Sequence, residues 1–236
     1  MHTFSMPQWA VDRVMERRGK LHICDDMQPE KTALIVVDLQ NGFMLPEFSP
    51  RPVETAAGTV PNVNKLADTL RATGGKVVWI KNTVDDRSVE EWSHWYNMGK
   101  PEWSRQRAET FREGAAGHTI YSDLIVKPED DIIHKFRFSA FLPESSDLAL
   151  RLRKGGYDTV LIVGTVTNVC CESSARDAMM MNFRTVMVSD GNSAFSDHEH
   201  EATLAAFYGI FGDVMTTDMV CNRLLHNSGK LAAAAE

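Results

Sequence analysis

The sequence predicts a three-layer α-β-α sandwich, in which helices cover both faces of a central, mostly parallel β-sheet. Short apolar runs rich in β-branched residues recur along the chain without alternating with polar residues, as expected of strands buried on both faces. Segments with helical periodicity lie between these runs. Such an alternation of strand, helix and strand implies right-handed crossovers and a parallel sheet.

In the first half of the chain, a helical arm is expected over residues 1–28, with Trp9, Val11, Val14 and Met15 on one face. The first strand is expected at residues 33–37 (ALIVV) and the second at residues 76–80 (KVVWI). Between them, residues 61–73 carry apolar side chains at spacings of three and four and end at a Gly-Gly pair, which predicts a helix with a clear stop.

Residues 85–118 are rich in Trp, Arg and Glu and form the longest stretch without an evident strand. They are expected to form an insertion or lid at the sheet edge. Beyond them, strands and helices alternate again: strand 131–134, helix 145–154, strand 159–163, helix 171–181, strand 185–188 and helix 198–207.

No repeat, low-complexity linker or shift in composition marks a domain boundary, so residues 29–229 are expected to form a single domain. The Ala-rich tail, residues 230–236, is interpreted as an addition from expression. The arm is a candidate for packing on a neighbouring subunit, and we expect a homo-oligomer, either a dimer or a tetramer.

Composition and charge restrict the class of partner. A net charge of −7 without any block of Lys or Arg argues against a nucleic-acid partner. No apolar run approaches the roughly 20 residues that span a bilayer, and the N-terminus lacks the pattern of a signal peptide, so we expect a cytoplasmic protein without a membrane partner. Four cysteines without disulfide-like spacing are expected to be reduced.

Three polar residues follow predicted strands: Asp38, Lys135 and Cys170. Ligands of open α/β sheets bind at the carboxyl ends of the strands, so these side chains are candidates for one site. A cysteine at a helix N-terminus near a lysine is favoured as thiolate, and a carboxylate can accept its proton. Taken singly, each residue has a plainer interpretation as a core cysteine, a turn cap or a solvated charge.

Three segments taken together favour the catalytic interpretation. The stretches ALIVVDLQNGF, HKFRFSAF and VGTVTNVCCESSARDA, in this order, resemble the signature segments of the isochorismatase-like cysteine hydrolase superfamily. The resemblance implies that family's three-layer fold and assigns Asp38, Lys135 and Cys170 as the catalytic triad. It also implies a cis peptide at Thr165-Val166, with the backbone N–H groups of Val166 and Cys170 as the oxyanion hole.

The departures from the family concern metal binding. Some family members carry an Asp and His metal cluster after the second strand, where this chain reads KNTVDD at residues 81–86. We therefore expect no metal and no cofactor. The spacing of His198 and His200 suits a strand better than the helix start expected there, so we interpret both as solvated or capping residues. Cys171 is expected to be a small core residue that faces away from the site.

The resemblance implies a cysteine amidohydrolase that cleaves a carbon–nitrogen bond of a small amide or ureide through an acyl or carbamoyl intermediate on Cys170. The motifs are most similar to the ureidoacrylate amidohydrolase branch, with the biuret and N-carbamoylsarcosine hydrolases as competitors. Vinyl ether hydrolysis of the isochorismatase type, or a non-catalytic binding role, are the alternatives. The candidate substrate-binding residues are Asn41, Phe43, Trp79, Arg137 and Phe138. Arg137 is either a contact for a substrate carboxylate or part of an ion pair.

Overall fold

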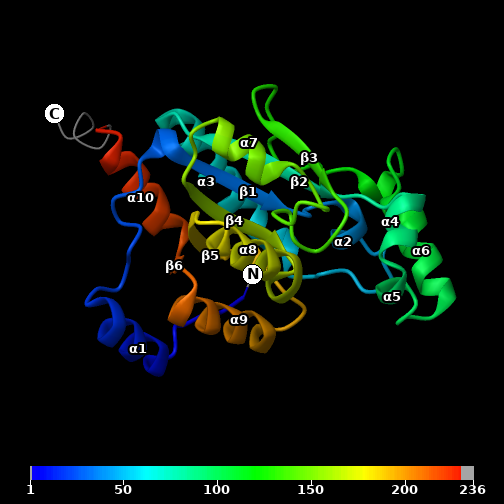
Figure 1. The fold of residues 1–236 in the computed structure, drawn as a ribbon, viewed down its shortest axis with the longest axis horizontal. Coiled ribbons are helices and arrows are strands. Elements are labelled where there is room, and N and C mark those ends of the chain that lie inside the picture. Colours follow the sequence, from blue (N-terminus) through cyan, green and yellow to red (C-terminus); the bar gives the residue numbers. More distant parts are fainter. Residues whose placement is uncertain (1, 230–236) are drawn as a thin grey trace.

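The computed structural model describes residues 2–229, so the interpretation of residues 230–236 lies outside the described residues. Six parallel strands form one sheet in the order β3-β2-β1-β4-β5-β6. Their bounds are β1 Thr32–Val37, β2 Lys76–Asn82, β3 Asp131–Lys135, β4 Thr159–Thr165, β5 Arg184–Ser193 and β6 Asp213–Met215. The predicted α-β-α fold class is confirmed, because helices cover both faces of this sheet (Figure 1).

Two apolar layers bury the sheet between its helices. One face packs against α7 (Leu148–Lys154), α8 (Glu172–Met180) and α9 (Asp197–Ile210). The other face packs against α3 (Val60–Thr73) and α10 (Thr217–Asn227). All six residues of β1 are buried, which explains why its sequence is continuously apolar instead of alternating.

The N-terminal arm contains one helix, α1 (Gln8–Arg18), whose buried residues are Ala10 and Val14. This face packs on α9 of the same chain. Of the residues expected on one face, Val14 is buried, whereas Trp9 and Met15 are exposed in this chain because the contact with α9 runs through Ala10 and Val14. Oligomer formation stays a prediction.

The expected insertion between β2 and β3 is helical. It contains α4 (Asp86–Glu91), α5 (Ser93–Tyr96), α6 (Pro101–Phe111) and the 3-10 turn η3 (Ala116–His118). These helices extend to one side of the sheet (Figure 1) and have a small apolar cluster of their own, centred on Val84, Tyr96 and Phe111. The short helix α2 (Asn41–Met44) follows β1 and contacts η3.

Two boundaries differ from the sequence expectation. The helix expected at residues 145–154 begins at Leu148, because Ser145 and Ser146 use their hydroxyls to hold the preceding loop. Strand β6 has only three residues, too short for an apolar pattern to indicate it.

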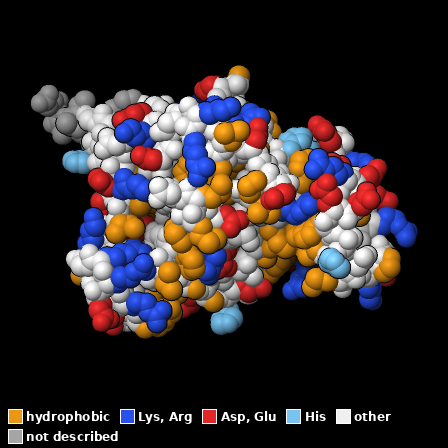
Figure 2. Space-filling view, viewed as in Figure 1, with side chains coloured by type: hydrophobic (Ala, Val, Ile, Leu, Met, Phe, Trp, Pro, Cys, Tyr) orange, Lys and Arg blue, Asp and Glu red, His pale blue; other side chains and the backbone are white. Residues whose placement is uncertain are grey.

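Lys, Arg, Asp and Glu side chains are interspersed on the face shown in Figure 2. Within the described residues, no helix is long and apolar enough to cross a bilayer.

Candidate active site

The site is built where three strands end. β1 delivers Asp38, β3 ends on Lys135, and β4 leads into the turn that carries Cys170. Asp38 has a left-handed φ of 56°, a conformation uncommon outside glycine. Its N–H donates to the carbonyl oxygen of Ile80, so this backbone turn is fixed against β2.

The structure brings the three predicted catalytic side chains into contact. The Lys135 Nζ atom lies 2.9 Å from Asp38 Oδ2 and 3.5 Å from Cys170 Sγ. It also donates to the carbonyl oxygen of Arg137 at 3.0 Å. Asp38 and Lys135 are 0% exposed and Cys170 is 2% exposed, so all three interact in a medium of low dielectric.

Burial controls the proton affinity of these groups. It raises the pKa of Cys170 to about 12, a shift that Lys135 opposes and Asp38 reinforces. Lys135 favours the thiolate, as expected, but burial acts in the opposite direction and has the larger effect. Burial also tends to lower the pKa of Lys135, but the Asp38 carboxylate and Cys170 raise it above its usual value. Lys135 thus remains an ammonium group.

Close packing of β4 on β1 positions the turn that carries Cys170. Gly164 has a φ of +122°, and a Cβ atom there would lie 2.0 Å from the carbonyl oxygen of Val37. Glycine is therefore required one residue before the end of β4. The π-helical turn Thr167–Cys171 follows and leads into α8.

The peptide bond between Thr165 and Val166 is cis, as the resemblance predicts. The Val166 carbonyl oxygen accepts hydrogen bonds from the N–H groups of Val169 and Cys171. The oxyanion role of the Val166 and Cys170 N–H groups stays a prediction. Cys171 is fully buried among core residues.

Two of the candidate substrate-binding residues lie in the aromatic region between the sheet and the insertion. The Phe43 ring lies 4.5 Å from the Phe111 ring, measured between centroids, and lines a pocket beside α6. The Phe138 ring packs edge-on against Trp92 and Trp95, with centroid distances of 4.8 and 5.3 Å.

The other three candidates have structural partners. Trp79 is buried beside α3, and its indole N–H donates to Asp130 at 2.8 Å, before the start of β3 rather than at its carboxyl end. The Asn41 side chain donates to the carbonyl oxygen of Ala116 and holds η3. Arg137 pairs with Glu91 at 3.5 Å and lies over the Trp92 ring. Of its two interpretations, the ion pair is the one that agrees with these contacts.

Three polar residues near the site were not predicted as site residues. The buried Gln40 side chain donates to the carbonyl oxygens of Asn82 and His118, and it accepts from the Asn82 N–H. Arg107 on α6 reaches Asn82 Oδ1 at 3.4 Å. The presence of Gln40 and Asn82 at strand ends was an available signal, whereas nothing in the pattern of α6 distinguishes Arg107 from its neighbours.

His200 was expected to be solvated or capping, and this is wrong. It is fully buried, its ring stacks on His2 at 4.3 Å, and its Nδ1 lies 2.9 Å from the Thr167 hydroxyl. Ser196 caps α9 instead. His198 is exposed, as expected. Among residues 2–229, no group of three or more His, Cys, Asp or Glu side chains is arranged to hold a metal ion.

Comparison with known families agrees with this geometry. The family model described as the isochorismatase domain matches residues 32–219. The chain belongs to the isochorismatase family. It is therefore a hydrolase of that family, and the matched residues include Asp38, Lys135 and Cys170.

Individual relatives in the family are similar over most of their length. A ureidoacrylate amidohydrolase, RutB of Agrobacterium fabrum, is 31% identical over 212 residues, covering 83% of this chain and 90% of that protein. An uncharacterized isochorismatase family protein of Bacillus subtilis, YwoC, is 30% identical over 190 residues, covering 80% of this chain and 92% of that protein.

Solved structures show the same fold. A cysteine hydrolase from Pseudomonas syringae pv. phaseolicola superposes with a TM-score of 0.76 and 27% identity, covering 86% of this chain and 96% of the other. An N-carbamoylsarcosine amidase from Thermoplasma acidophilum gives a TM-score of 0.61 and 26% identity, covering 80% of this chain and 97% of the other.

Proposed function

We propose that this chain is a cysteine amidohydrolase that cleaves a carbon–nitrogen bond of a small amide or ureide. The observation that carries the proposal is the buried contact of Lys135 with both Asp38 and Cys170. A nucleophile, a base and a cation in contact are the groups required for acyl transfer. Relatives named as ureidoacrylate amidohydrolases support a ureide as substrate.

In the proposed first half-reaction, Asp38 takes the thiol proton as Cys170 Sγ attacks the substrate carbonyl carbon. Such a transfer is needed because the resting thiol has a pKa of about 12. The N–H groups of Val166 and Cys170 would bind the resulting oxyanion. Collapse of the tetrahedral intermediate breaks the carbon–nitrogen bond, and Asp38 returns the proton to the leaving amine.

The second half-reaction releases the acyl or carbamoyl group from Cys170. A water molecule attacks the thioester carbonyl while Asp38 accepts one of its protons, and the thiol leaves with that proton. Lys135 stays charged throughout and stabilises the negative charge as it moves between the carboxylate and the sulfur. A ureide would release an amine first and carbamate second.

Product analysis tests the proposal. Purified protein is incubated with a panel of carboxamides, ureides and isochorismate, and ammonia and the organic product are measured for wild type and Cys170→Ala. We expect release of ammonia from an amide or ureide by wild type alone. Isochorismate cleavage without amide or ureide hydrolysis would replace this proposal with vinyl ether hydrolysis, and no turnover of any compound would favour a binding role.

A further inference from the structure

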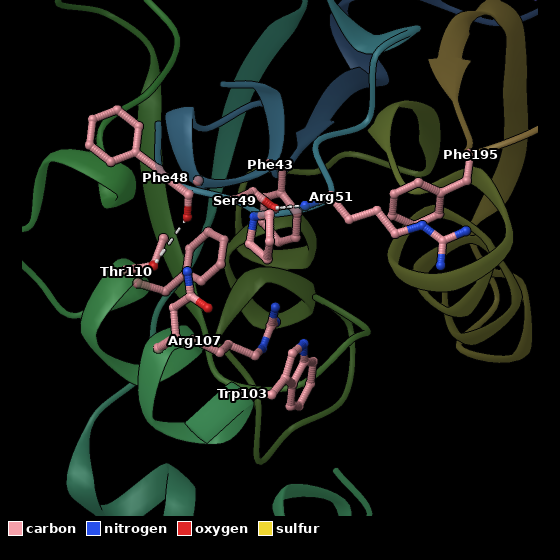
Figure 3. A pocket seen from close by; sticks show the side chains of 12 residues that line it. Phe43, Phe48, Ser49, Arg51, Trp103, Arg107, Thr110 and Phe195 are labelled. Carbon is pink, nitrogen blue, oxygen red and sulfur yellow. Dashed lines mark hydrogen bonds between the residues drawn. The ribbon is translucent and has the colours of Figure 1, made fainter. Parts of the chain in front are cut away.

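A pocket of about 190 Å³ lies between α2, α6 and the loop after β5. Its walls include Phe43, Trp103, Phe111 and Phe195. Its charged lining residues are Arg51 and Arg107, and none of the Asp or Glu residues in 2–229 lines it. In Figure 3, Arg107 projects from α6 toward the middle of the pocket, and Arg51 extends toward Phe195 at the far side. In a chain with a net charge of −7, this pocket is locally positive.

Aromatic rings hold the Arg107 guanidinium. Its carbon Cζ lies 5.0 Å from the centroid of Phe111, 5.2 Å from Trp95 and 5.7 Å from Phe43. Such stacking fixes the planar group and leaves its edge to form hydrogen bonds. Within residues 2–229, Arg107 forms no ion pair with a carboxylate within 4.0 Å, unlike Arg137, which pairs with Glu91.

Two buried donors at this position have no hydrogen-bond partner among the described residues. They are Arg107 Nε and Asn82 Nδ2. The two residues touch, because Arg107 Nη2 donates to Asn82 Oδ1 at 3.4 Å. An unsatisfied buried donor costs about 1–3 kcal/mol, so a pair of them indicates an acceptor supplied by a ligand.

This donor pair lies next to the catalytic triad. Asn82 ends β2 and pairs in register with Lys135 on β3. The positive charge of Arg107 also acts on the triad, since it opposes protonation of both Cys170 and Lys135. A ligand bound to Arg107 would therefore extend from the aromatic pocket toward Cys170.

We propose that Arg107, held by Phe43 and Asn82, binds the carboxylate of an acidic substrate whose scissile carbonyl lies at Cys170. The inference rests on the proposed amidohydrolase function and narrows its substrate class to ureides or amides that carry an acid group. Arg and carboxylate form two parallel hydrogen bonds, which fixes the direction of the substrate as well as its position. Arg51 adds positive charge at the opposite wall of the pocket.

Binding to an inactive variant tests the inference separately from turnover. Calorimetry measures the affinity of Cys170→Ala for 3-ureidopropionate and for its uncharged methyl ester. We expect the acid to bind at least about tenfold more tightly than the ester, the difference that one charged hydrogen-bonded pair provides. Adding Arg107→Met should remove this preference and leave ester binding within about threefold, which also shows that the variant is folded.

The matched control is Arg105→Met, because Arg105 is an exposed arginine on the same helix. In the Cys170→Ala background it should keep the full preference for the acid. Equal binding of acid and ester by Cys170→Ala, or a preference that survives Arg107→Met, would overturn the inference. Selective acid binding without amide or ureide hydrolysis by wild type would instead sink the proposed function and leave the anion site standing.

Discussion

At the scale of single residues, the site combines a buried cysteine, the proposed nucleophile, with a lysine whose charge the neighbouring carboxylate favours. Burial raises the pKa of Cys170 to about 12 and so disfavours a free thiolate in the resting protein. The Asp38 carboxylate lies against Lys135, and its Oδ1 atom has no hydrogen-bond partner among the described residues. In the proposed mechanism, this oxygen atom receives the thiol proton.

Substitution of each of the two adjacent cysteines should show which one is the nucleophile and which one is a core residue. Cys170→Ala should abolish turnover because Cys170 is the cysteine whose sulfur lies within 3.5 Å of Lys135 Nζ. Cys171→Ala should keep most activity because Cys171 packs among core residues. Turnover assays and iodoacetamide labelling with peptide mapping provide the measurements. Modification of Cys171 that tracks the loss of activity would reverse the assignment.

The buried ion pair predicts a stability effect that a double substitution should reverse. Lys135→Met leaves the Asp38 carboxylate uncompensated in a fully buried position, so the free energy of unfolding should fall by about 3–5 kcal/mol. Adding Asp38→Asn removes that charge and should restore much of the loss, although both variants lack activity. Urea denaturation measures all three proteins. Additive losses in the double variant would show that the two groups are not coupled.

The meeting of these three side chains could be predicted from sequence because Asp38 follows β1, Lys135 ends β3 and Cys170 lies in the turn after β4. Parallel strands end at one edge of the sheet. Arg107 could not, since it lies in the middle of α6, where only tertiary packing decides which face meets the site. Trp79 shows that a correctly predicted strand does not by itself predict the contacts of its side chains. Its strand was predicted correctly, but its contact with Asp130 depends on a loop that carries no periodic signal.

At the scale of elements, the approach of β4 to β1 positions the turn that carries Cys170. Gly164→Ala would put a methyl group 2.0 Å from the Val37 carbonyl oxygen at a φ of +122°, which forces β4 away from β1. We expect a loss of several kcal/mol in unfolding free energy and a loss of activity, because Cys170 and Asp38 would separate.

Gly74→Ala is the matched control for this substitution. Gly74 also has a positive φ, +93°, but a Cβ atom there would meet nothing within 4 Å. Only backbone strain remains, so we expect a loss of about 1 kcal/mol and normal activity. Thermal or urea unfolding of both variants separates steric contact from backbone strain, and equal losses at the two sites would contradict this account.

The elements that could be located well from sequence are those buried on both faces, such as β1 and β4. Their continuous apolar runs are typical of strands covered by helices on both sides. The position of the insertion could be predicted, but its helices α4, α5 and α6 could not. They bury few residues and therefore carry a weak apolar pattern. His200 shows why α9 was only partly understood. The helix start expected there indicated a solvated or capping role, whereas His2 of the N-terminal arm stacks on its ring in the folded chain.

At the scale of the whole molecule, two buried histidines should make stability depend on pH. Burial lowers the pKa of His118 to about 4, with Lys81 and His134 acting in the same direction. Burial and the neighbouring His2 lower the pKa of His200 to about 4. Both are therefore neutral in the folded protein at pH values where the unfolded chain, with an ordinary histidine pKa near 6.5, takes up protons.

Proton uptake by the unfolded chain decides in which direction stability changes with pH. Between pH 6.5 and 4 the unfolded state binds more protons than the folded state, so stability is full above this window and falls as the pH falls through it. A lowering of this size corresponds to about 3 kcal/mol for each histidine at the acid end. Urea unfolding at pH 7 and pH 5 should show the loss. His200→Gln should reduce the slope, whereas His198→Gln, an exposed change on the same helix, should not. An unchanged slope in His200→Gln would exclude His200 as a source of the acid sensitivity.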